Sequence, residues 1–94
     1  MDKKQINTFV WERGHNVMLA DGFEDAFLGL VESKGSVPKA CYDREKCINI
    51  LEERDGMPYL EAVEFLDFNV TDAYVGESTP SFLERIDGVL RFEP

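Results

Sequence analysis

The spacing of hydrophobic residues changes part-way along the chain, from a pattern typical of strands to one typical of helices. Residues 26–31 form a short apolar run bounded by polar residues, which predicts a strand over residues 25–32. Lys34, Gly35 and Ser36 then give a turn signal. We expect residues 37–42 to return as a second strand, with Pro38 at its start, where a missing N–H does little harm. This part of the chain therefore predicts a β-hairpin.

Two helices are expected after the hairpin. Asp43 is a candidate N-cap for a helix over residues 44–54, and Gly56 is predicted to end that helix. Pro58 suits the first position of a second helix, which we expect to end near Gly76. Each helix has an apolar face: Cys47, Ile48 and Leu51 in the first, and Tyr59, Ala62, Val63, Leu66, Val70, Ala73 and Tyr74 in the second.

The two ends of the chain have weaker patterns. Ile6, Phe9 and Val10 have helical spacing and predict a short helix, with a strand over residues 8–12 as the alternative. Trp11 is expected to cover the core, with a role at a protein interface as the alternative. Near the other end, Asp87 and Gly88 form a turn signal before a candidate strand over residues 89–92. The whole order predicts a single α+β domain over residues 1–94, in which a β-hairpin packs on an antiparallel helix pair.

Acidic residues outnumber basic ones and are unevenly distributed. The chain has 94 residues, with 19 Asp and Glu against ten Lys and Arg, and a net charge of −9. Residues 43–77 hold ten acidic and three basic residues, a balance of −7. Direct binding to nucleic acid or to an anionic membrane is disfavoured, because both need clustered cations. We expect a basic partner protein to be steered toward this half of the molecule, unless the acids only form a solvated face.

Apolar residues of the second helix also lie outside its core stripe. Leu60, Phe65, Phe68 and Val75 are interleaved with acids, so either the helix is buried on two sides or an apolar and acidic surface is exposed. An exposed surface of this kind predicts a protein interface, with the two phenylalanines as anchors. The candidate partner-binding residues are Glu52, Glu53, Glu61, Glu64, Phe65, Asp67, Phe68 and Asp72.

Catalytic and metal-binding patterns are weaker. Cys41 and Cys47 are expected to be reduced, small core residues, and with His15 as the sole histidine they give too few ligands for a zinc site. Glu32 and Lys34 form an E-x-K motif, with Asp21 and Asp25 upstream, as in metal-dependent nucleases, where carboxylates hold Mg²⁺ and the Lys aids the attacking water; a solvated hairpin turn explains the same Glu and Lys. No cofactor is expected. No signal peptide is seen after residue 1, so we expect a cytoplasmic protein.

Several stretches resemble one group of known proteins. They are DGF at residues 21–23, CYDREKCI at 41–48, ERDGMPY at 53–59, EAVE at 61–64, FNV at 68–70 and AYVGESTP at 73–80. Over about residues 21–83 the chain resembles a group of small proteins encoded by bacteriophages and prophages. The resemblance implies an accessory role in a bacterial cytoplasm during infection, and it carries no catalytic residues.

Charge and resemblance together predict a non-enzymatic binding module. Its expected partner is a basic host or phage protein, and its expected effect is to inhibit or modulate a defence or nucleic-acid-handling protein, with carboxylates imitating phosphates. One alternative is a small metal-dependent nuclease that uses Glu32 and Lys34. Another is a self-assembling structural protein, and a homodimer stays open as well.

Overall fold

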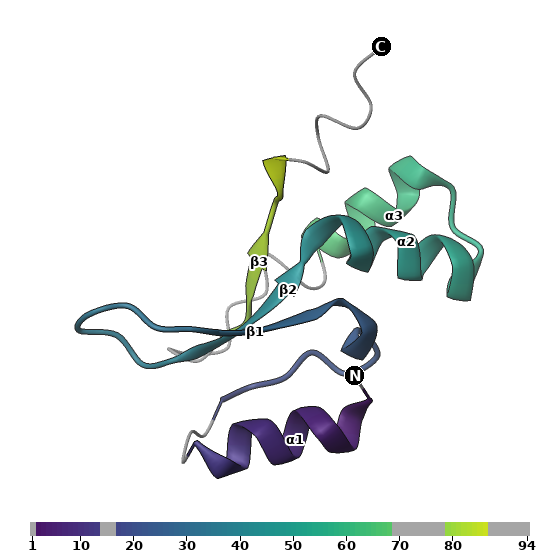
Figure 1. The fold of residues 1–94 in the computed structure, drawn as a ribbon. Helices are drawn as coiled ribbons and strands as arrows, with labels where there is room; N and C mark the ends of the chain where they lie inside the picture. Colours follow the sequence, from purple (N-terminus) through teal and green to yellow (C-terminus); the bar gives the residue numbers. More distant parts are fainter. Residues whose placement is uncertain (1, 14–16, 69–78, 87–94) are drawn as a thin grey trace.

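The computed structural model describes residues 2–13, 17–68 and 79–86, which form helices around a three-stranded sheet (Figure 1). The elements are α1 (Lys3–Glu12), the 3₁₀ turn η1 (Glu24–Ala26), β1 (Phe27–Val31), β2 (Lys39–Asp43), α2 (Arg44–Asp55), α3 (Tyr59–Leu66) and β3 (Ser81–Leu83). The α+β class and the hairpin with its helix pair are thus confirmed. None of the helices described is both long enough and apolar enough to cross a bilayer.

The hairpin pairs β1 with β2 in antiparallel register. Phe27 faces Tyr42, Gly29 faces Cys41 and Val31 faces Lys39, with a bulge between Phe27 and Gly29. Gly29 has a φ of +148°, which favours a residue without a Cβ. The predicted first strand began too early, because Glu24–Ala26 forms the 3₁₀ turn instead.

The third strand, β3, was not predicted. It runs parallel to β2, with Cys41 opposite Ser81 and Asp43 opposite Leu83 (Figure 1). Three residues directly after Pro80 are too few to show an alternating pattern, so this pairing leaves no signal in the sequence. The strand predicted over residues 89–92 lies outside the described residues. Because β2 is central in the sheet, residues 40–43 are all buried.

Helix α2 begins and ends at the predicted signals. The Asp43 side chain accepts a hydrogen bond from the Lys46 backbone N–H at 3.2 Å, as an N-cap does. Gly56 closes the helix with a φ of +68°. The helix continues to Asp55, one residue further than predicted. Its predicted apolar face is confirmed, since Cys47, Ile48 and Leu51 are buried.

Helix α3 returns along α2 after a three-residue connection and packs against it (Figure 1). Pro58 is the N-cap and not the first helical residue, because its ψ of 155° is extended. Ala62 and Leu66 bury the inner face of α3. The second helix was predicted to continue to near Gly76, and the part of that prediction beyond residue 68 lies outside the described residues.

The core lies between the sheet and the helix pair. Phe23, Ala26, Tyr42, Leu51 and Leu66 belong to one buried cluster. The Tyr42 hydroxyl accepts a hydrogen bond from the Ala20 backbone N–H at 2.8 Å, which satisfies the polar end of this buried ring.

Helix α1 packs beside the hairpin through one narrow stripe. Ile6 and Val10 are buried, and Phe9 makes an edge contact with Phe27 at 6.2 Å between ring centroids. The expectation that Trp11 covers the core is wrong, because this side chain is 80% exposed. Trp11 follows Val10 by one position, which turns it about 100° away from the buried stripe.

Candidate partner surface

Apolar and acidic side chains share the solvent side of α3. Ala62 and Leu66 define the buried side of the helix, and Leu60 and Phe68 point elsewhere: they are 74% and 82% exposed. Glu61 and Glu64 are exposed as well. Leu60, Glu61 and Glu64 of α3, together with Phe68 in the π-helical turn that directly follows it, are called the outer face of α3 below. Of the two alternatives for this helix, the described residues show an exposed surface and not burial on both sides.

Phe65 and Val75 were predicted to belong to the same surface. Phe65 is 37% exposed and lies at the margin of the outer face. Val75 lies outside the described residues. The phenylalanine predicted as an anchor is therefore well exposed at position 68 and only partly exposed at position 65.

The acidic residue Asp67 is held within the molecule. Arg44 Nη1 of α2 donates a hydrogen bond to Asp67 Oδ1 at 2.6 Å, and this bond raises the pKa of Arg44. The ion pair ties the start of α2 to the end of α3. Asp67 was predicted to contact a partner, but its carboxylate already has an internal cation.

The other predicted acids are on different parts of the molecule. Glu52 is half-buried on α2, Glu53 lines a separate groove, and Asp72 lies outside the described residues. Glu61 and Glu64 are thus the predicted acids that the structure brings together with an exposed phenylalanine. The acidic run does not form one continuous surface among the residues described.

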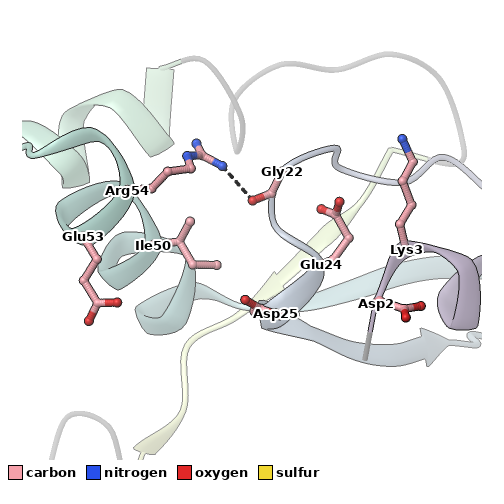
Figure 2. Close-up of a pocket in the computed structure, with 8 residues that line it drawn as sticks. All are labelled: Asp2, Lys3, Gly22, Glu24, Asp25, Ile50, Glu53 and Arg54. Carbon is pink, nitrogen blue, oxygen red and sulfur yellow. Dashed lines mark hydrogen bonds between the residues drawn. The ribbon is translucent and has the colours of Figure 1, made fainter.

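The groove lies between the start of α1, η1 and the second half of α2 (Figure 2). Its volume is about 540 Å³. Four of its lining residues carry carboxylates, two carry cations, and Ile50 supplies apolar surface. The lining residues are Asp2, Lys3, Gly22, Glu24, Asp25, Ile50, Glu53 and Arg54.

Both cations of the groove are paired with carboxylates that do not line it. Lys3 Nζ lies 3.1 Å from Asp21 Oδ1, and Arg54 Nε lies 3.1 Å from Asp55 Oδ1. Arg54 Nη1 also donates to the Gly22 carbonyl at 2.8 Å, as the dashed line in Figure 2 shows. The hydrogen bond from Arg54 lowers the pKa of the exposed Asp55 carboxyl. The groove is therefore electronegative and disfavours phosphate groups.

Sequence reasoning did not place these acids together. Asp2, Asp25 and Glu53 are far apart along the chain, and no spacing rule connects a helix N-cap with a turn and a later helix. One oxygen of Glu24, Oε2, is buried with no hydrogen-bond partner in the structure. The groove depends on how the start of α1, η1 and α2 pack together, which the pattern along the sequence does not show.

The residues of the nuclease alternative are spread over the surface. Glu32 and Lys34 are exposed in the hairpin loop after β1, and Asp21 faces Lys3. Among the residues described, no three His, Cys, Asp or Glu side chains gather as metal ligands would. His15 lies outside the described residues.

The two thiols are core groups. Cys41 and Cys47 are buried and free, as predicted. Burial raises the pKa of Cys47 to about 12, and burial together with the nearby Asp43 carboxylate raises the pKa of Cys41. Both thiols are therefore protonated and poorly nucleophilic at neutral pH.

Comparison of the chain with models of protein families, with curated proteins and with solved structures found no significant match in any of the three.

Proposed function

We propose that this chain is a non-enzymatic protein-binding module that docks through the outer face of α3 onto a cationic surface of another protein. The observation that carries the proposal is the exposure of Leu60 and Phe68 next to Glu61 and Glu64. Burying one such apolar side chain in an interface is worth roughly 1.5–3 kcal/mol. Two of them, surrounded by charges of one sign, give both an anchor and a means of selecting the partner.

The proposed partner is a basic host or phage protein. The net charge of −9 attracts cationic surfaces over distances of about 10 Å at moderate salt. Enzymes that handle nucleic acid carry basic grooves, and defence enzymes of bacteria are among them. The resemblance to small phage-encoded proteins supports this target class, with inhibition or modulation as the proposed effect in a bacterial cytoplasm.

The proposal is tested by comparing captured proteins between surface variants. The tagged wild type, the double variant Leu60→Ala/Phe68→Ala and the control Trp11→Ala/Leu28→Ala are each used to capture proteins from bacterial lysate. The control removes exposed apolar side chains from α1 and β1. We expect a protein that the wild type and the control retain and the α3 variant loses.

The captured protein should also be released as salt rises, since part of the attraction is electrostatic. Circular dichroism establishes that both variants are folded. Identical capture by the wild type and the α3 variant would show that the outer face of α3 is not the docking surface.

A further inference from the structure

We infer that the outer face of α3 recognises an α-helix of its partner in which Lys or Arg alternates with apolar residues at intervals of four. This inference rests on the proposed function and names the element that the surface would bind. It follows from the order of side chains on α3, from the state of the α3 backbone and from the sign of the charge.

The exposed side chains form an ordered row. Leu60 and Glu64 are four positions apart on α3, and Phe68 follows four positions later in the π-helical turn that extends the helix, so an apolar, an acidic and an apolar side chain follow one another over roughly 12 Å. Rows of residues four apart form the ridges by which helices most often pack on each other. A partner helix with apolar, basic and apolar side chains at successive intervals of four residues would be complementary to this row.

The backbone of α3 favours a helical partner over an extended one. From Ala62 onward its backbone N–H groups find acceptors in the preceding turn, beginning with the bond from Ala62 N–H to the Pro58 carbonyl at 2.9 Å. A peptide that binds as an added strand gains its affinity from free main-chain groups at the edge of a sheet, which a helix face does not offer. A helix brings its backbone hydrogen bonds with it, so it can bind through side chains alone.

The charge excludes a second copy of this chain as the favoured occupant. Residues 57–68 contain no Lys or Arg, and the carboxylate of Asp67 is already paired with Arg44. Glu61 and Glu64 therefore set the sign of the outer face. Two such faces in contact would bring carboxylates together without cations, whereas a basic helix would neutralise them.

The test uses two synthetic peptides with the same number of Leu and Lys residues and the same net charge, and measures their binding by fluorescence anisotropy at 50 mM salt. The first is a stapled helical peptide with Leu and Lys in the alternating order described above. The second peptide contains the same Leu and Lys residues together with proline, which prevents it from forming a helix. We expect the wild type to bind the helical peptide at least about tenfold more tightly, a difference of about 1.4 kcal/mol.

Variants of the outer face locate the binding. We expect each of two double variants to lower the affinity for the helical peptide about tenfold: Glu61→Gln/Glu64→Gln and Leu60→Ala/Phe68→Ala. The matched control Glu12→Gln/Glu32→Gln removes the same charge from exposed residues on α1 and after β1, and should change affinity less than about twofold. Amide NMR shifts of the wild type should change around residues 60–68 on titration with the helical peptide.

The outcomes separate the inference from the proposed function. Equal affinity for both peptides, with loss in the α3 variants, would overturn helix recognition and leave the docking surface in place. Affinity unaffected by Leu60→Ala/Phe68→Ala would overturn both. Self-association of the wild type through residues 60–68 would show that a second copy occupies the face and would overturn the inference.

Discussion

A single residue, Asp43, connects the sheet to the helix pair. It ends β2, caps α2 through Lys46, and lies 3.6 Å from Arg85 Nη1 through Oδ2. We expect Asp43→Ala to lower the free energy of unfolding by about 1 kcal/mol. Asp43→Asn keeps a capping oxygen and loses the charge, so the difference between the two variants isolates the cap. Urea unfolding measures both, and equal losses would contradict a capping role.

Cys47 makes the protein sensitive to alkali. Its pKa is raised from 9.0 to about 12 by burial, so above pH 9 the unfolded thiol loses its proton while the folded thiol keeps it. The unfolded state then binds fewer protons, and stability falls as pH rises from about 9 to about 12. We expect the titration of this thiol to lower the free energy of unfolding by about 1 kcal/mol between pH 7 and pH 10. Urea unfolding at both pH values should show a smaller loss for Cys47→Ala than for the wild type; equal losses would contradict the assignment.

Gly56 controls the connection between α2 and α3 at the scale of an element. Its φ of +68° is left-handed, and a Cβ built there would meet no atom within 4 Å. The expected loss for Gly56→Ala is therefore conformational and amounts to about 1 kcal/mol of unfolding free energy. Gly56→Asn should lose less, because asparagine tolerates this conformation better. Thermal unfolding of the two variants checks the order, and a harmless Gly56→Ala would show that the connection can adopt another turn.

The Arg44–Asp67 pair joins the same two helices by their side chains. The pair is partly exposed, so Asp67→Asn should lower stability by at most about 1 kcal/mol. The same change should alter affinity for a cationic helical peptide less than Glu64→Gln does, because the Asp67 carboxylate is already neutralised. Anisotropy titration of the two single variants makes the comparison. A larger effect of Asp67→Asn would return this residue to the docking surface.

The sequence allowed prediction of those elements whose ends carry local signals. Asp43 and Gly56 bound α2 as expected, because capping and left-handed closure depend on one residue and its neighbours. The start of α3 was predicted one residue too early, at Pro58, because a proline suits both the N-cap and the first helical position. The strand β3 was not predicted, because its pairing partner, β2, is about 40 residues away in the sequence. Local pattern contains no information on such contacts.

At the scale of the whole molecule, the acidic run is divided by the fold. Consecutive acids on a helix point about 100° apart, so Glu52 and Glu53 separate, and Glu53 joins carboxylates of α1 and η1 across the groove. For the second helix the sequence left open either burial on two sides or an exposed apolar and acidic surface, and the exposure of Leu60 and Phe68 favours the second alternative. The sequence did not indicate which acids the fold would use internally, as with Asp67, since that depends on tertiary contacts with α2.

The same distribution of charge predicts the association state. Each molecule carries −9, and the outer face of α3 holds Glu61 and Glu64 beside its exposed apolar side chains. At neutral pH and low salt, two such faces repel each other, so sedimentation velocity should find a monomer of 10.8 kDa. Glu61→Gln/Glu64→Gln removes the repulsion and leaves Leu60 and Phe68 exposed, so this variant should self-associate as its concentration rises. The control Glu12→Gln/Glu32→Gln has the same net charge and should stay monomeric, which separates the local effect from the global one. A wild-type dimer under these conditions would instead favour a self-assembling protein, with the carboxylates of α3 neutralised by the partner copy.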